Sequence, residues 1–387
     1  MPKPERGSKG ARRSAPLLED DRKWMRRAVR LAARGQGETN PNPLVGCVVV
    51  KGGRVVGEAW HRRAGGRHAE VQALARAGAK ARGATLYVNL EPCVHHGRTP
   101  PCAPLLIEAG LRRVVAAMRD PDPRVDGRGV ALLRRAGIAV TLGLLEDEAA
   151  ALNERFVVAA RRSRPYVTLK AALTLDGRIA TARGESKWIT SPAQRRDARR
   201  LRGLHDGVAV GIGTVLADDP MLLPQPRVTR PFYRVVFDSR LRLPPGGRLA
   251  RSARSSPVWV VCAKAEARKR AALERKGVTV LEQPSRGARV SLARAVRELW
   301  RRGIRSLVVE GGSELLGAFL AARLVDAVAL YRAPVILGGR EGVPAFGGPA
   351  APRLADALAL RPASAAQRRA WGAQAGLLEL WYPLTSR

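Results

Sequence analysis

The sequence predicts an α/β protein built from two domains. Its 387 residues are enough for two separate hydrophobic cores. Short apolar runs of strand character alternate with stretches whose apolar residues recur at helical spacing, on both sides of a segment at 146–162 that is rich in alanine and charge. Because strands that alternate with helices favour a sheet covered on both faces, we expect a three-layer α/β unit in the first half.

The first half shows this alternation in order. Trp24, Ala28 and Leu31 recur at helical spacing and predict a first helix. The apolar run 45–50 ends at Gly52–Gly53, which predicts a hairpin into a second strand. A helix is expected to begin at residues 68–70. Three further strands are expected at 85–89, 114–118 and 138–142.

The second half begins after the segment 146–162, which predicts a single connecting helix. A strand is expected at 166–170, and a strand at 307–309 leads through Gly311–Gly312 into a helix that opens at Ser313. Apolar runs at 328–330 and 334–337 predict a β-rich end. We therefore divide the chain into a disordered basic tail (1–18), a first domain (19–145), a connecting helix (146–163) and a second domain (164–387).

Four residues of the first half form a set with metal chemistry. His68 and Glu70 lie two positions apart, and Cys93 and Cys102 follow with eight residues between them. One imidazole and two thiolates can hold zinc and leave a fourth position for water, whose pKa zinc lowers to roughly 7. Glu70 would stay off the metal and carry a proton from water to a leaving amine, as in the H-x-E and P-C-x-x-C signature of zinc deaminases. The set therefore predicts a catalytic zinc site.

The two cysteines have alternative roles that their residue type and spacing leave open. They could be buried thiols or ligands of a structural zinc knuckle, and their spacing is longer than the usual two residues. A structural site normally closes with four ligands and needs no glutamate beside the histidine. His95 and His96 are rival ligands, which we interpret as donors that line a pocket. Pro92 and Pro100–Pro101 favour helix starts at both cysteines.

The net charge of +36 invites a nucleic-acid-binding interpretation, since arginine-rich surfaces follow phosphate backbones. The arginines are spread along the whole chain, however, and the aromatic content of 4% is poor for stacking bases. We interpret the excess as a compositional bias on solvated helix faces. The chain has no apolar run of membrane-spanning length, no secretory signal and only four cysteines, so we expect a cytoplasmic protein.

Glycines suggest a nucleotide site in the second half. Gly211 and Gly213 begin like a dinucleotide fingerprint, but Leu216 replaces its third glycine. Gly311–Gly312 is better placed because it precedes a helix, where backbone amides can meet a phosphate, although a plain tight turn accounts for it equally well. Three polar residues at strand ends or in loops could face a cleft, namely Lys170, Asp218 and Glu310.

The chain from about residue 20 to 385 resembles the bifunctional deaminase–reductase family of riboflavin biosynthesis. The matching stretches are NPLVGCVV (42–49), HAEVQAL (68–74), LEPCVHHGRTPPC (90–102), LKAALTLDGRIA (169–180), SKWITS (186–191), TVLADDP (214–220), DSR (238–240) and VEGGSELLGAFL (309–320). The resemblance covers both halves, and the long insert between the two cysteines is typical of this family.

The resemblance implies a cytidine-deaminase-like α/β/α first domain and a dihydrofolate-reductase-like α/β second domain. The first would remove the 2-amino group of 2,5-diamino-6-(5-phosphoribosylamino)pyrimidin-4(3H)-one by zinc-dependent hydrolysis. The second would use NADPH to reduce the ribosyl side chain, giving 5-amino-6-(5-phosphoribitylamino)uracil. The resemblance also implies Glu70 as the proton carrier, Asn42 against the pyrimidine, and zinc on His68, Cys93 and Cys102.

In the second domain the resemblance assigns two groups of residues. Those at the family's NADPH positions are Ala172, Trp188, Thr214, Asp218, Ser239 and Gly312. Those at its substrate positions are Ser186, Arg202, Leu222 and Glu310, with Lys170 close by. Arg202 would hold the substrate phosphate through paired hydrogen bonds.

One position departs from the family. After ADDP the family usually carries Leu-Thr-x-Arg, whose arginine meets the substrate phosphate, whereas this chain has Gln225 near that place. Arg227, two residues later, is expected to substitute for it.

We expect a small phosphorylated pyrimidine as substrate and a homo-oligomer, either a dimer or a tetramer, with no nucleic-acid or membrane partner. One alternative is a tRNA deaminase with an accessory C-terminal domain, which the charge favours but which leaves residues 165–387 without a role. The other is a non-catalytic, zinc-stabilised binding protein, in which Glu70 would have no role.

Overall fold

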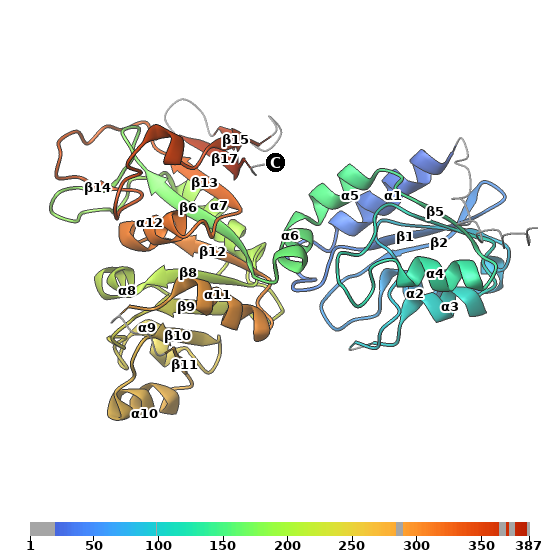
Figure 1. Ribbon diagram of the computed structural model, residues 1–387, viewed down its shortest axis with the longest axis horizontal. Coiled ribbons are helices and arrows are strands. Elements are labelled where there is room, and N and C mark those ends of the chain that lie inside the picture. The colour runs from blue at the N-terminus through green and yellow to red at the C-terminus, as the bar shows by residue number, and fades with distance from the viewer. Residues whose placement is uncertain (1–19, 98, 284–288, 364–368, 371–375, 385–387) are drawn as a thin grey trace, which may run out of the picture. The chain divides into compact units, whose positions relative to one another are not determined.

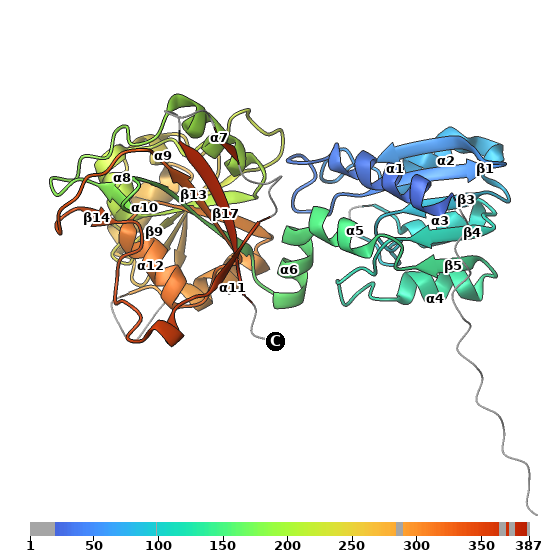
Figure 2. The ribbon, with the colours of Figure 1, turned by 90° about the horizontal axis from the view of Figure 1, so that it is seen from above.

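The computed structural model describes residues 20–97, 99–283, 289–363, 369–370 and 376–384 (Figure 1 and Figure 2). The chain divides into two compact units, with the division between Val157 and Val158. The tail expected at residues 1–18 lies outside the described residues. None of the described helices is long and apolar enough to cross a membrane.

The first unit contains a five-stranded sheet in the order β2-β1-β3-β4-β5. β1 pairs antiparallel with β2 and β3, whereas β3, β4 and β5 are parallel. The strands are β1 (Gly46–Lys51), β2 (Arg54–Trp60), β3 (Thr85–Val88), β4 (Arg113–Ala116) and β5 (Ala139–Leu142), as expected from the sequence. The helices are α1 (Asp21–Ala33), α2 (Ala69–Ala77), the 3₁₀ turn η1 (Gly78–Ala81), α3 (Cys102–Glu108), α4 (Arg128–Arg135) and α5 (Glu146–Leu152).

Helices cover both faces of this sheet (Figure 1). On one face α2, α3 and α4 bury small and aliphatic side chains such as Ala73, Leu106 and Leu133. On the other face α1 buries Met25 and Ala28, and α5 packs beside it. The predicted three-layer α/β/α arrangement is therefore confirmed, and it follows from amphipathic helices that alternate with buried strands.

The expected single connecting helix is instead two helices, α5 and α6 (Glu154–Arg162), which meet at Asn153. The buried side chain of Asn153 accepts a hydrogen bond from the Leu44 amide at 2.8 Å and donates one to the Leu44 carbonyl at 2.9 Å. Asn89 adds a 2.8 Å bond to the same carbonyl. Asn153 thus lies at the break between the two helices, where its side chain holds the segment that follows Asn42. Helical periodicity does not reveal such a long-range contact.

The second unit contains a ten-stranded sheet with the main order β11-β10-β9-β8-β12-β6-β13-β17-β15. The strands from β11 to β13 in this order are parallel to one another. β17 pairs antiparallel with both β13 and β15. The strands are β6 (Tyr166–Leu173), β8 (Gly207–Gly211), β9 (Tyr233–Phe237), β10 (Val258–Cys262), β11 (Thr279–Glu282), β12 (Ser306–Glu310), β13 (Ala327–Arg332), β15 (Leu360–Pro362), β16 (Arg369–Ala370) and β17 (Leu377–Pro383), with β7 (Arg178–Ala180) and β14 (Val343–Pro344) as a separate pair.

Helices also flank this second sheet. They are α7 (Pro192–Gly203), α8 (Ile212–Asp218), α9 (Arg248–Arg251), α10 (Ala267–Arg275), α11 (Leu292–Arg301), α12 (Ser313–Ala321) and the 3₁₀ turn η2 (Leu354–Asp356). Strand residues alternate between two cores, so that Leu169 and Val309 face α11 and α12, whereas Val236 and Val260 face α9 and α10. Since the parallel strands end along one edge, residues at their carboxyl ends can meet in one cleft.

The strand expected at 334–337 is not present, and this prediction was wrong. The Val335 carbonyl accepts a 2.7 Å hydrogen bond from the Leu175 amide, and the Asp176 carboxylate accepts bonds from the amides of Leu337 and Gly338. The apolar side chains are not buried, and Ile336 is 69% exposed. This backbone is bonded to a loop, which apolar composition alone does not distinguish from a strand.

Candidate functional site

The three expected metal ligands meet at one place in the first unit. His68 is the N-cap of α2, Cys102 is the first residue of α3, and Cys93 lies in the loop after β3. Their ligand atoms all lie within 4.8 Å of one another, and His68 Nδ1 is 3.1 Å from Cys102 Sγ and 3.6 Å from Cys93 Sγ. The helix start expected after Pro92 is absent, whereas the start after Pro100–Pro101 is confirmed.

The chemistry of this cluster suits zinc. Within the described ranges it is the only group of three or more histidine, cysteine or acidic side chains with metal-binding spacing. Hydrogen bonds from Cys102 and His68 lower the pKa of the Cys93 thiol to about 4, which favours the thiolate that binds metals. One nitrogen and two sulfur donors form a three-ligand set that leaves a position open. His95 and His96 do not belong to the cluster, and His96 is exposed.

Thr99 supports the histidine, a role that sequence reasoning missed. Its hydroxyl oxygen lies 3.1 Å from His68 Nε2, on the opposite side of the ring from the two thiols. Such a contact on the second ring nitrogen fixes the orientation and tautomer of a ligating histidine. In the sequence, the one feature that could have indicated this role is the position of Thr99 between the two ligand cysteines.

Glu70 is the free carboxylate that the motif requires. It lies in the first turn of α2, is 4% exposed, and its Oε2 has no hydrogen-bond partner among the described residues. Burial raises the pKa of Glu70. A buried carboxylate with an open oxygen and a raised pKa is suited to take up a proton and release it again.

Asn42 is fixed by His61, which the sequence analysis did not single out. Asn42 Nδ2 lies 3.1 Å from His61 Nε2, and His61 Nδ1 lies 3.2 Å from the Arg67 carbonyl. Burial lowers the pKa of His61, which favours the neutral ring. Because Nδ1 must then donate to the carbonyl, Nε2 accepts from the Asn42 amide, which leaves Oδ1 of Asn42 as the acceptor for a ligand.

Glu91 fixes the loop that carries Cys93. Its buried carboxylate accepts hydrogen bonds from the amides of Gly127 at 2.9 Å and Val130 at 3.0 Å. These amides are the N-cap and third residue of α4, where a helix has unpaired donors and a positive dipole end. Glu91 therefore ties the strand that delivers Cys93 to the start of α4.

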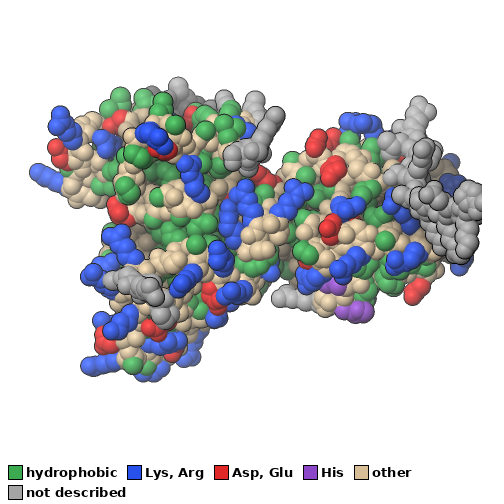
Figure 3. All heavy atoms as spheres, viewed as in Figure 1, with side chains coloured by type: hydrophobic (Ala, Val, Ile, Leu, Met, Phe, Trp, Pro, Cys, Tyr) green, Lys and Arg blue, Asp and Glu red, His purple; other side chains and the backbone are tan. Residues whose placement is uncertain are grey.

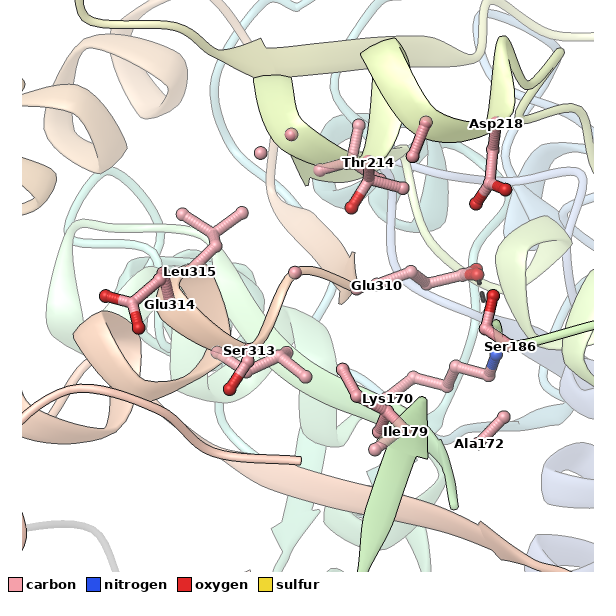
Figure 4. A pocket seen from close by; sticks show the side chains of 18 of the residues that line it. Lys170, Ala172, Ile179, Ser186, Thr214, Asp218, Glu310, Ser313, Glu314 and Leu315 are labelled. Atoms are coloured by element: carbon pink, nitrogen blue, oxygen red, sulfur yellow. Dashed lines mark ion pairs between the residues drawn. The ribbon is translucent and has the colours of Figure 1, made fainter. Parts of the chain in front are cut away.

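A single pocket in the second unit brings together every residue that the resemblance assigned there. Figure 4 shows Lys170 of β6 and Glu310 of β12 pointing toward one another, with Thr214 and Asp218 of α8 nearby. The expected residues that line this pocket are Lys170, Ala172, Ser186, Trp188, Arg202, Thr214, Asp218, Leu222, Arg227, Ser239, Glu310 and Gly312. The roles of these residues stay predictions.

A buried charge cluster forms the floor of this pocket. Arg202 Nε and Nη2 donate to the two carboxylate oxygens of Glu310 at 2.7 and 2.9 Å, and Lys170 Nζ lies 3.7 Å from the same carboxylate. Burial alone would raise the pKa of Glu310, but Arg202 and Lys170 lower it to about 2. Arg202 Nη1 also donates to the Leu223 carbonyl at 3.0 Å, so most of its donors are occupied by protein groups.

The glycine turn that follows Glu310 suits a phosphorylated cofactor. Gly311 and Gly312 have φ values of 70° and 75°, which favour glycine, and they lead directly into α12. A side-chain carbon at Gly312 would meet only the Thr214 hydroxyl, at 3.4 Å, so the backbone is open to a ligand. Trp188 is 69% exposed with the guanidinium of Arg195 stacked 4.4 Å from its ring.

Two family models match the chain. The model described as the cytidine and deoxycytidylate deaminase zinc-binding region matches residues 18–118, and the RibD C-terminal domain matches residues 165–368. The riboflavin biosynthesis protein RibD of Escherichia coli (strain K12) is 45% identical over 332 residues, which cover 82% of this chain and 89% of the relative. RibD of Actinobacillus pleuropneumoniae is 43% identical over 342 residues, covering 88% and 91%.

Solved structures agree with these matches. Form 1 of Acinetobacter baumannii RibD superposes with a TM-score of 0.85 at 38% identity, covering 95% of this chain and all of that one. The diaminohydroxyphosphoribosylaminopyrimidine deaminase/5-amino-6-(5-phosphoribosylamino)uracil reductase of Thermotoga maritima gives a TM-score of 0.80 at 36% identity, covering 94% and 99%. With a zinc-type ligand cluster in one unit and a reductase pocket in the other, the chain belongs to the RibD family of bifunctional riboflavin biosynthesis enzymes.

Proposed function

We propose that the first unit hydrolyses the 2-amino group of 2,5-diamino-6-(5-phosphoribosylamino)pyrimidin-4(3H)-one and that the second reduces the ribosyl group of the product to ribityl. The observation that carries this proposal is the pairing of a His68, Cys93 and Cys102 cluster with a buried, open Glu70 carboxylate. A purely structural zinc site would give Glu70 no function. The second reaction is supported by a pocket that combines an open glycine turn with a buried charge cluster.

In the deaminase unit His68, Cys93 and Cys102 would hold zinc. Zinc, when bound, acts as a Lewis acid that makes water a nucleophile at neutral pH. Glu70 takes the proton from that water and returns it to the departing amine, a transfer that contributes about 10²–10⁴-fold to the rate. Thr99 keeps the His68 ring oriented, and Asn42 presents its carbonyl oxygen to a ring N–H of the pyrimidine.

In the reductase unit we assign the cofactor side of the pocket to Ala172, Trp188, Thr214, Asp218, Ser239 and Gly312. NADPH supplies the hydride, so the protein need only align the two reactants and exclude water. We assign the substrate side to Lys170, Ser186, Arg202, Leu222, Arg227 and Glu310. Lys170 and Glu310 are a charged pair in this pocket that could contact a sugar hydroxyl or carbonyl of the substrate.

The nucleic-acid alternative is not favoured. The RibD model accounts for residues 165–368, which have no role in a tRNA deaminase. Arginine and lysine side chains are dispersed among acidic ones on the face seen in Figure 3, without forming one continuous stripe. We further infer a cytoplasmic enzyme, since the four cysteines are free, and a homo-oligomer, either a dimer or a tetramer.

The test is the Glu70→Gln variant of the full chain. Its zinc content should equal that of the wild type, because Glu70 is not a ligand, while ammonia release should fall at least ~100-fold. Cys93→Ser should lose zinc and activity together. Glu148→Gln, at an exposed position on α5, is the matched control and should change neither quantity. A Glu70→Gln enzyme that still releases ammonia at the wild-type rate refutes the assignment.

A further inference from the structure

Helix α7 places a row of arginines along the reductase pocket. Arg195, Arg199 and Arg202 recur at spacings of four and three residues, which puts them on one helix face, and all three line the pocket. Arg196 and Arg200 of the same helix are exposed and do not line it. The helical repeat therefore places Arg195, Arg199 and Arg202 on the pocket side of α7 and Arg196 and Arg200 on its solvent side.

The three pocket arginines differ in how their charge is balanced. Arg202 is neutralised by Glu310. Arg195 is held over the Trp188 ring and donates to the Thr190 carbonyl. Among the described residues Arg199 makes no ion pair, and its one side-chain hydrogen bond is to the neutral amide of Gln225. Arg199 thus brings an uncompensated positive charge to the pocket while remaining half-buried.

Two hydrogen bonds join Gln225 to Arg199. In the side chains, Arg199 Nε donates to Gln225 Oε1 at 2.8 Å, and in the backbone, the Gln225 N–H donates to the Arg199 carbonyl at 3.2 Å. Because the amide oxygen occupies Nε, both Nη groups remain as donors. The planar guanidinium can offer them to two oxygens of a phosphate at once.

We propose that Arg199, oriented by Gln225, binds the phosphate of the reductase substrate. This inference rests on the proposed function, which gives that substrate a 5-phosphate. The proposal also explains why a glutamine can serve at position 225. An arginine there would repel Arg199, whereas the glutamine side chain accepts a hydrogen bond from it. Arg227 is exposed and makes no hydrogen bond within the described part of the chain, so it is less fixed than Arg199.

The first experiment measures NADPH oxidation by the full chain with the deaminated substrate in its phosphorylated and dephosphorylated forms. Arg199→Ala should raise the KM of the phosphorylated substrate about 10- to 150-fold, the range for losing a hydrogen bond to a charged group, with little change in kcat. The KM of the dephosphorylated substrate and the KM of NADPH should not change, which separates the substrate phosphate from the cofactor phosphates. Arg200→Ala, on the solvent side of α7, should behave as the wild type.

A second set of variants tests the role of Gln225 as a positioning residue. Gln225→Glu keeps the shape but neutralises Arg199, so it should raise the same KM at least about tenfold. Gln225→Ala should raise it less, and it should add nothing in the Arg199→Ala background, because the glutamine acts through the arginine. Thermal unfolding of each variant checks that the fold is kept.

Two outcomes overturn the inference. One is an unchanged KM for the phosphorylated substrate in both Arg199→Ala and Gln225→Glu, and the other is an equal rise for both forms of the substrate. Failure of the proposed function is distinguishable, since the wild-type chain would then oxidise no NADPH with the deaminated substrate at all.

Discussion

Replacing Glu310 by glutamine should strongly destabilise the second unit. Glu310 is buried at the end of β12, where it pairs with Arg202 through two hydrogen bonds and with Lys170 at 3.7 Å. Glutamine fills the same volume but leaves the two half-buried cations, Lys170 and Arg202, without a counter-charge. Removing one partner of a buried ion pair costs about 3–5 kcal/mol, and we take this range for Glu310→Gln because the carboxylate itself is buried.

Calorimetric unfolding of the full chain can measure this loss. The transition of the second unit is the one that NADPH shifts upward, because a ligand stabilises the unit that binds it. At about 2–4 °C per kcal/mol for a unit of this size, the transition should fall by roughly 6–20 °C. Glu274→Gln, which breaks the exposed pair with Arg270, is the control and should leave the transition almost unchanged because solvent screens that pair. A Glu310→Gln loss as small as that of the control refutes the reasoning.

The interaction of Glu310 with Arg202 and Lys170 also makes the free energy of unfolding depend on pH. The pKa of Glu310 in the folded chain is about 2, below its ordinary value of 4.5. The stabilisation is therefore fully present above pH 4.5 and is lost as pH falls from there through about 2. The difference in unfolding free energy between wild type and Glu310→Gln should stay constant near neutrality and shrink below pH 4.5. A difference that persists unchanged at acidic pH would mean that ionisation of Glu310 is not its source.

Two further predictions concern the reductase unit. A fragment of residues 164–387 should oxidise NADPH when given deaminated substrate, because all the described residues that line the pocket lie from Lys170 onward. A folded but inactive fragment would argue that the other unit completes the site. Arg227→Ala should raise the KM of the phosphorylated substrate about tenfold at unchanged kcat, with deaminase activity intact as the internal control. An unchanged KM would leave Arg227 among the solvated arginines.

The sequence predicts those features of the fold and the sites that are encoded locally. Apolar periodicity indicates the strands and helices of the first unit, and the spacing of His68, Cys93 and Cys102 indicates the metal cluster. The glycine turn before Ser313 is likewise visible, since a positive φ at two successive residues favours glycine. Each of these signals lies within one segment or within one motif.

Contacts between distant segments could not be predicted in this way. Asn153 breaks a helix to bind Leu44, more than a hundred positions away. His61 orients Asn42 and Glu91 caps α4 through bonds between separate loops, although neither has a residue type that marks it. Gln225 looked like the loss of a charge in the sequence, and only the structure shows that it holds Arg199. The meaning of a polar residue therefore depends on its partner more than on its type.

The arginine excess illustrates the same dependence. Arg113 is buried and paired with Asp21, and Arg164 is buried and paired with Asp326, so these two serve the fold. Arg234 is fully buried with no carboxylate partner in the described chain, and its guanidinium donates to Ser252 Oγ and to backbone carbonyls. Arg199 has the same chemistry but lines a pocket and keeps its charge unbalanced. A net charge of +36 therefore combines at least three uses of one residue type, and only the arginines that face the pocket with unpaired donors bear on the choice of substrate.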